Sequence, residues 1–121
     1  MMGHPLDRGK AAEAAAADFL SQRGYRIIAR NWRHQHLEVD IIAYHGDILV
    51  FVEVKMRSSA AFGMPYEAVS LAKQEKLARA ANHYIEQHNH QGEIRFDVVS
   101  ILQINPTSPN IRLIQDAFWP E

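Results

Sequence analysis

The feature that most constrains the fold is a pair of apolar, β-branched runs separated by a short turn signal. The turn residues His45-Gly46-Asp47 lie between residues 41–44 (Ile-Ile-Ala-Tyr) and residues 48–52 (Ile-Leu-Val-Phe-Val). Isoleucine and valine favour strands, and a glycine between two such runs indicates a β-hairpin. Charged residues bound the runs at the end away from the turn, within the segments Glu38-Val39-Asp40 and Glu53-Val54-Lys55.

The register of this hairpin decides whether its acids meet. In an antiparallel pair without a bulge, opposed residues have a constant sum of residue numbers, and an odd sum places Asp40 and Glu53 on one face. A sum of 91 pairs Glu38 with Glu53, whereas a sum of 93 pairs Asp40 with Glu53. Directly opposed Cβ atoms lie about 5 Å apart, which lets one cation bridge two carboxylates. An even sum would separate the acids unless a bulge restored them.

Carboxylates crowded on apolar strands repel one another and lose hydration. A divalent cation would relieve both effects, as would protonation or exposure at the end of the sheet. Oxygen ligands favour Mg²⁺ or Mn²⁺ over zinc, and the lack of cysteine excludes a cysteine-ligated metal. Lys55, on the same strand face as Glu53, can hold a water molecule or stabilise charge on a phosphate. From the pattern alone, ion pairs at a solvated strand end explain these residues equally well.

These residues resemble the D…(D/E)-x-K core of restriction-endonuclease-like nucleases, with Asp40 as the first acid and Glu53-Val54-Lys55 as the second part. A wider ordered set resembles the YraN-like bacterial family, which is placed near Holliday-junction resolvases. The set comprises Arg8-Gly9-Lys10-Ala11-Ala12-Glu13, Gly24-Tyr25, Asn31-Trp32-Arg33, Glu38-Val39-Asp40, Leu49 to Lys55, Phe62-Gly63, Ala68-Val69, Lys73 and Arg95 to Val99. This resemblance covers about residues 8 to 118.

The resemblance implies a metal-dependent endonuclease that hydrolyses phosphodiester bonds in DNA, including branched or damaged structures. It makes Asp40, Glu53 and the carbonyl of Val54 ligands of Mg²⁺ or Mn²⁺, and Lys55 the group that orients the attacking water. Glu13, on the first helix, and Glu38 would also reach toward the metal. Two alternatives on the same fold remain open, namely a nucleic-acid-binding module that does not cut and a protein-interaction subunit.

Basic residues are concentrated in the first two-thirds of the chain. The net charge is −1, but residues 1–79 hold 11 Lys and Arg against 9 Asp and Glu, whereas residues 80–121 hold 2 against 5. Arg33 follows Trp32 in an arginine-rich stretch, where the two side chains can contact a phosphate and a base. Packing in the core is the alternative for Trp32. Bound metal would offset part of the acidic charge and leave the face around the site locally basic, although an ordinary mixed surface explains the charge distribution equally well. DNA is the partner that the resemblance implies.

Four further residues are candidates for contacts with nucleic acid. Arg57 and Ser58 follow the predicted site directly, where they can reach a phosphate or form a plain connector. Lys73 and Gln74 lie early on the next predicted helix, and the resemblance places a polar or basic residue of this helix at the site. A solvated helix face is the alternative for both.

The remaining patterns complete an α/β fold. They predict an alanine-rich helix over about Asp7 to Arg23, a strand over Tyr25 to Arg33, a helix over Leu71 to His88 capped by Ser70, and strands over Ile94 to Ile104 and Ile111 to Ile114. The order α-β-β-β-α-β-β predicts a mixed sheet flanked by helices, as in the restriction-endonuclease-like core that the resemblance implies. We expect one domain over residues 1–121, with a loose leader at residues 1–6.

Composition restricts the classes of protein that fit. A hydrophobic content of 47% and a charged content of 22% are typical of a globular domain. The absence of cysteine excludes disulfides, no apolar run approaches the length of a membrane span, and the start of the chain lacks a signal-peptide core. We therefore expect a cytoplasmic protein without a membrane partner. The fold is also compatible with a homodimer.

Overall fold

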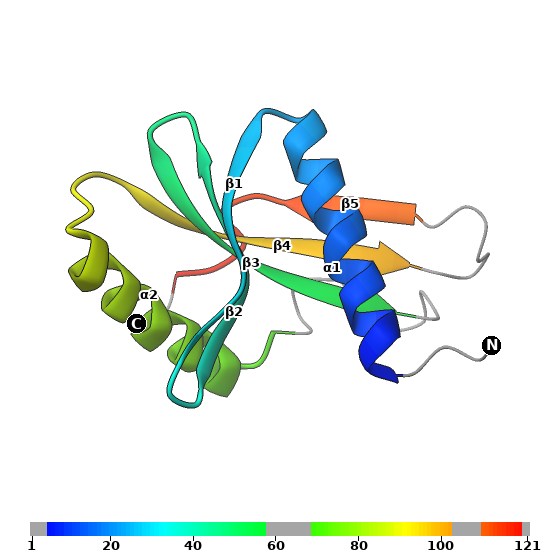
Figure 1. Cartoon of the computed structure of the whole chain (residues 1–121), viewed down its shortest axis with the longest axis horizontal. Coiled ribbons are helices and arrows are strands. Elements are labelled where there is room, and N and C mark those ends of the chain that lie inside the picture. Colours follow the sequence, from blue (N-terminus) through cyan, green and yellow to red (C-terminus); the bar gives the residue numbers. More distant parts are fainter. Residues whose placement is uncertain (1–4, 58–68, 103–109, 120–121) are drawn as a thin grey trace.

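The computed structural model describes residues 5–57, 69–102 and 110–119, and its elements follow one another in the predicted order (Figure 1). They are α1 (Pro5–Gln22), β1 (Tyr25–His34), β2 (Leu37–His45), β3 (Ile48–Arg57), α2 (Leu71–His88), β4 (Ile94–Leu102) and β5 (Asn110–Ile114). The last two residues of the predicted leader, Pro5 and Leu6, are helical, and residues 1–4 lie outside the described residues. Proline suits the first helical turn because the amide hydrogen it lacks would have no partner there.

A five-stranded mixed sheet forms the centre of the described structure, with the strand order β1-β2-β3-β4-β5. Neighbouring strands are antiparallel except β3 and β4, which are parallel. A parallel pair needs a crossover connection, and α2 lies in the connection between them. Val98 and Val99 of β4 are fully buried on opposite faces of the sheet, as their continuous apolar run predicted. The expected α/β fold, consistent with the restriction-endonuclease-like architecture, is confirmed.

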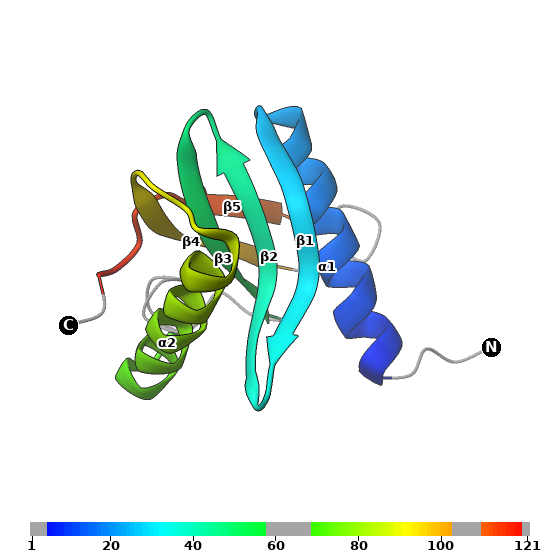
Figure 2. The same cartoon turned by 60° about the vertical axis from the view of Figure 1, so that its left-hand side comes forward.

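The two helices cover opposite faces of the sheet (Figure 2). On one face, small side chains of α1 let this helix lie close to the strands, and the buried residues include Ala12, Ala16, Leu20, Ile41, Val50 and Val52. On the other face, α2 packs on an aromatic core that includes Phe51, Leu77, Tyr84 and Phe96. Burial of each large apolar side chain contributes about 1.5–3 kcal/mol to folding, so both faces fix the sheet in place.

Helix α2 begins at the predicted cap. The hydroxyl oxygen of Ser70 accepts a hydrogen bond from the amide of Lys73 at 3.1 Å, which fixes the first helical turn. The helix ends at His88, as predicted, and Asn89 follows it with a left-handed φ of 50°. Asparagine tolerates this conformation better than most side chains, so it serves as the helix end. The cap places Lys73 at the end of the helix that lies beside β3 and its acidic residue Glu53.

The β2–β3 hairpin adopts one of the two odd registers. His45 pairs with Ile48 across the turn at Gly46 and Asp47, and Ile41 pairs with Val52, which gives a sum of 93. Gly46 has a φ of 63°, a conformation that glycine adopts without strain. Pairing with β2 ends at Val52, whereas β3 continues beside β4 as far as Arg57. The two strands therefore form a fork that opens just beyond Ile41 and Val52.

The regular alternation of β2 breaks at the fork. Val39 belongs to the core that faces α2, and Ile41 belongs to the core that faces α1, although residues two apart share a face in a regular strand. Asp40 lies between them, opposite the position of Asn31 on β1, which has a positive φ of 52°. A second irregularity, on β1 between Ile27 and Ala29, interrupts the regular alternation of this strand. The break turns Asp40 away from both apolar cores.

A buried polar network lies near the start of β1. The carboxylate of Asp97, fully buried, accepts hydrogen bonds from the Arg95 guanidinium at 2.9 and 3.0 Å, from the Tyr25 hydroxyl at 2.7 Å and from the Asp116 amide at 2.9 Å. Burial raises the pKa of Tyr25 to about 12, so its hydroxyl stays protonated and donates. These bonds give Asp97 a structural role, because they satisfy its carboxylate within the interior.

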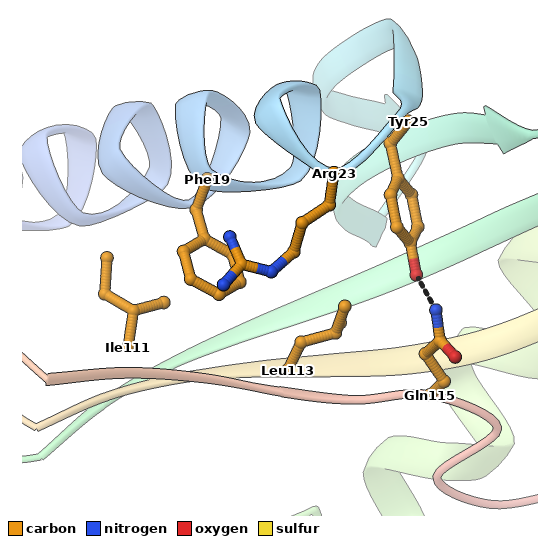
Figure 3. Close-up of a pocket in the computed structure, with 6 residues that line it drawn as sticks. All are labelled: Phe19, Arg23, Tyr25, Ile111, Leu113 and Gln115. Atoms are coloured by element: carbon orange, nitrogen blue, oxygen red, sulfur yellow. Dashed lines mark hydrogen bonds between the residues drawn. The ribbon is translucent and has the colours of Figure 1, made fainter.

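The hydroxyl of Tyr25 also accepts a hydrogen bond from the Gln115 amide at 2.9 Å, as Figure 3 shows. The two residues line one end of a pocket of about 520 Å³ between α1 and β5, together with Phe19, Arg23 and two apolar residues of β5. The guanidinium of Arg23 lies 3.5 Å from the centre of the Phe19 ring. None of the described residues that line this pocket carries a carboxylate, so they do not provide the predicted acids.

Candidate active site

Asp40 occupies the fork between β2 and β3. Its Oδ2 atom accepts a hydrogen bond of 2.8 Å from the backbone amide of Val54. This amide lies beyond the last backbone pair of β2 with β3, so the carboxylate replaces the missing strand partner. The same bond holds Asp40 beside the acid that precedes Val54.

Glu53 is a buried acid beside two lysines. The residue is 4% exposed, and its carboxylate lies 3.5 Å from the Nζ atom of Lys55 and 3.9 Å from that of Lys73. Asp40 and Glu53 also influence each other's pKa, which places the two carboxyl groups side by side. The two acids predicted to share a face therefore meet, and the amine predicted to accompany them lies within ion-pair distance.

The shared environment raises the pKa of both acids. Burial is the largest cause for each, because the charged form loses hydration. For Glu53 the charge of Asp40 adds to this effect, and the pKa rises to about 7 even though Lys73 and Lys55 oppose the rise. For Asp40 the amide of Val54 is the largest opposing influence. In the absence of a cation, Glu53 is therefore partly protonated near neutral pH.

Two further acids lie on the α1 side of the fork. Glu13 and Glu38 line a cavity of about 350 Å³ that also contains Asp40. Burial, and then the charge of Asp40, raises the pKa of Glu13. Glu38 is half-exposed and forms an ion pair of 3.5 Å with Arg33, which lines the same cavity. Asp40 thus connects two groups of charges, one with Glu53 and one in this cavity.

The residues predicted to contact nucleic acid after β3 and on α2 have different positions in the structure. Gln74 donates a hydrogen bond of 3.1 Å to the carbonyl oxygen of Val69, so its amide supports the start of α2. Arg57 is the last residue of β3, and its side chain lies outside the described part of the structure, as does the whole of Ser58. Lys73 is the member of this group that contacts a site carboxylate.

Lys10, Asn31 and Met56 also line the cavity, although they were not predicted as site residues. Lys10 lies three residues before Glu13 on α1, and side chains at this spacing share a helix face. Asn31 carries a weaker signal, since asparagine is among the residues that adopt a positive φ. The position of Met56 depends on how β3 passes the fork, for which the sequence holds no local signal.

The donor atoms of the site fit a hard divalent cation. Within the described residues, no group of three His, Cys, Asp or Glu side chains is close enough to hold a metal. Mg²⁺, however, is usually held by one or two carboxylates and completes its shell with water and substrate phosphate. Asp40 and Glu53 provide two such carboxylates, and a cation would replace the proton on Glu53.

The fold and the site define a class of protein. A mixed sheet between two helices, with an acid on one strand and a Glu-x-Lys sequence on the next, is consistent with a restriction-endonuclease-like protein. The model of "Uncharacterised protein family UPF0102" matches residues 12–101, and the chain belongs to this family. This confirms the YraN-like resemblance.

Several UPF0102 proteins are similar over nearly the whole chain. One from Rhodococcus opacus is 43% identical over 118 residues, covering 97% of this chain and 100% of the relative. STH1475 from Symbiobacterium thermophilum is 49% identical over 111 residues, covering 91% of this chain and 94% of the relative. One from Bacteroides thetaiotaomicron is 42% identical over 121 residues, covering 98% of each. In the described parts of the present chain, neither helix combines the length and hydropathy that crossing a membrane needs.

The raised pKa of Glu53 predicts that stability depends on pH. The pKa is about 7 in the folded protein and near 4.5 in the unfolded chain, so the folded state binds more protons between these values. The free energy of unfolding should therefore fall as pH rises through this window, by about 2–3 kcal/mol from this group. Urea unfolding in EDTA at about pH 5 and about pH 8 measures the difference.

Glu53→Gln should remove most of this pH dependence, because the amide does not titrate. Glu75→Gln is the matched control, since Glu75 is an exposed residue of α2 paired only with Arg79 among the described residues. In this control, the free energy of unfolding should change with pH as it does in the wild type. Equal slopes for Glu53→Gln and the wild type would contradict the assignment of the proton to this pair.

Proposed function

We propose that this protein is a metal-dependent endonuclease that hydrolyses phosphodiester bonds in DNA. The observation that carries the proposal is the meeting of Asp40 and Glu53 at the fork, beside the ammonium group of Lys55. Two adjacent carboxylates are a site for Mg²⁺ or Mn²⁺, and a neighbouring lysine suits an anionic substrate. A purely structural ion pair would need only one acid there.

Each residue has a distinct role in this proposal. Asp40, Glu53 and the carbonyl oxygen of Val54 would hold the cation, with Glu13 on the cavity side of Asp40. When bound, the cation would polarise the phosphate and lower the pKa of a bound water. Lys55 would orient the attacking water and stabilise negative charge that develops on the phosphate oxygens. In the overall hydrolysis, the water oxygen bonds to phosphorus, the bond to the leaving oxygen breaks, and that oxygen gains a proton.

Basic residues around the fork support an anionic partner. Lys73 lies beside Glu53, and Lys10 and Arg33 line the cavity beside Asp40. Bound metal would offset the acids among them, which leaves these cations for contacts with phosphate groups. We therefore propose DNA, including branched or damaged forms, as the substrate in a cytoplasmic setting.

Metal binding is the first test of the proposal. Because a ligand that binds only the folded state stabilises it, Mn²⁺ at about 100 times its dissociation constant should add about 2.7 kcal/mol. A rise in the thermal midpoint of several degrees is expected for the wild type, and little change for Asp40→Ala. Glu75→Gln, away from the fork, should respond as the wild type does. An equal shift in Asp40→Ala would place the metal elsewhere.

A non-cleaving nucleic-acid-binding module is the second candidate. It is favoured by the two lysines that already lie within 3.9 Å of Glu53, because they neutralise this acid without a metal. Incubation of duplex, branched and single-stranded DNA, and of RNA, with Mg²⁺ or Mn²⁺ distinguishes the two functions. Salt-dependent binding of the wild type without cleavage would select the second candidate.

A further inference from the structure

The strand pair that leads into the fork continues beyond it as a two-stranded ribbon. We call residues 31–40 the β1–β2 ribbon. Its last pair is His34 opposite Leu37, so Gln35 and His36 alone form the turn. Both turn residues are exposed. Figures 1 and 2 show this cyan turn at the lower extreme of the drawn chain, beyond the end of β3's pairing with β2.

Helix α2 supports one face of the ribbon. Trp32 packs edge-on against Tyr84 with ring centres 5.7 Å apart, which confirms a packing role for this indole. The ring of His34 stacks on that of His83 at 4.2 Å. The ribbon's Leu37 is also buried in the core that faces α2. The ribbon is therefore held in place by the helix, and its position relative to the fork is fixed before any partner binds.

The opposite face of the ribbon leads to the candidate active site. Asn31 and Arg33 line the cavity that contains Asp40. His36 lies four positions before Asp40, which at about 3.3 Å per residue in an extended chain gives a separation of about 13 Å. The major groove of B-form DNA is about 12 Å wide and admits a two-stranded ribbon. If a backbone phosphate of DNA lay at Asp40, the turn could thus reach the neighbouring major groove.

Gln35 occupies a position of the turn at which glycine would be less strained. Gln35 has a φ of 57°, a conformation that strains residues with a Cβ atom. Nothing among the described contacts binds the Gln35 side chain to the rest of the protein, so folding gains no packing from it. Its amide can both donate and accept hydrogen bonds, which is the pattern that matches the edge of adenine in the major groove.

We propose that the β1–β2 ribbon inserts its turn into the major groove of duplex DNA, with Gln35 and His36 contacting base edges while the adjacent phosphate lies at the fork. This inference rests on the proposed function, because it takes DNA to be the partner of that site. It narrows the substrate to one with a double-helical segment beside the reacting phosphate. Supported on α2, the turn at Gln35 and His36 positions the duplex and takes no part in bond cleavage.

Gln35→Gly is the decisive variant because it separates folding from binding. Glycine relieves the positive φ, so the thermal midpoint should rise by a few degrees, while the base contact is lost. Fluorescence anisotropy of the full chain, with Ca²⁺ as the divalent cation and at about 0.1 M salt, measures binding to a labelled duplex of about 20 base pairs and to one of its strands. The variant should bind the duplex about tenfold more weakly and the single strand less than twofold more weakly.

His36→Ala tests the second residue of the turn and should weaken duplex binding in the same direction. Gln91→Ala is the matched control, since Gln91 is exposed beyond the end of α2, and it should bind as the wild type does. Duplex binding by Gln35→Gly equal to that of the wild type would overturn the ribbon proposal and leave the proposed function standing. Stronger wild-type binding to the single strand would do the same. A wild type that binds no DNA would overturn both.

Discussion

Replacing Glu53 with glutamine is expected to reduce Mn²⁺-dependent DNA cleavage by on the order of 100- to 1000-fold, the scale of losing one charged group at a reacting centre. The amide has nearly the same shape but no negative charge, so it cannot replace the carboxylate beside Asp40. The stability of the variant should equal or exceed that of the wild type above pH 7, because the buried acid no longer has to ionise. A loss of activity would then reflect chemistry rather than unfolding.

Two further variants test whether the loss of activity comes from the fork. Glu75→Gln removes an acid from the same chain without touching the fork, and its kcat should stay within about twofold of the wild-type value. Lys55→Met should also lower kcat, since it removes the amine 3.5 Å from Glu53. Full activity in Glu53→Gln and in Lys55→Met would exclude the fork as the catalytic centre. Initial rates on a labelled DNA substrate at saturating Mn²⁺ provide the measurement.

Replacing Asp97 with alanine is expected to destabilise the protein by about 3–5 kcal/mol. The change leaves the Arg95 guanidinium, the Tyr25 hydroxyl and the Asp116 amide without their acceptor in the interior. Since a domain of this kind has about 5–15 kcal/mol of stability in total, the thermal midpoint should fall by more than 10 °C. Calorimetry or urea unfolding at neutral pH measures the effect.

Asp18→Ala is the matched control for this prediction, because Asp18 is an exposed residue of α1 and its loss should cost less than about 0.5 kcal/mol. Tyr25→Phe removes one hydroxyl from the same network and should cost about 1–2 kcal/mol. A loss below 1 kcal/mol for Asp97→Ala would show that water replaces the missing carboxylate.

The sequence was sufficient for the order of elements and for the meeting of the acids. Alternating and continuous apolar runs located the strands, and the turn at Gly46 limited the hairpin to a few registers. Both odd registers bring Asp40 near Glu53, so the site could be predicted before the register was known. The resemblance alone placed Lys73 at the site, because no local pattern links α2 to β3. Its contact with Glu53 was not predicted.

The finer geometry of the site depends on tertiary contacts that local patterns do not encode. The simple alternation of β2 ends at Asp40, and the partner of this acid is a backbone amide, which every residue except proline has. The Tyr25–Asp97 bond joins residues 72 positions apart. Gln74 was predicted to contact nucleic acid, yet its amide bonds to Val69. Contacts of this kind depend on how the elements pack in the folded structure.

The alanine stripe of α1 has a consequence for how this family can vary. Ala16 is fully buried between the helix and the sheet, and it lies less than one turn from Glu13. A larger side chain at this position would lift the helix and carry Glu13 away from Asp40. A residue without any reactive group therefore sets the spacing of two acids, and its volume can adjust the strength of their repulsion while every charged residue stays the same.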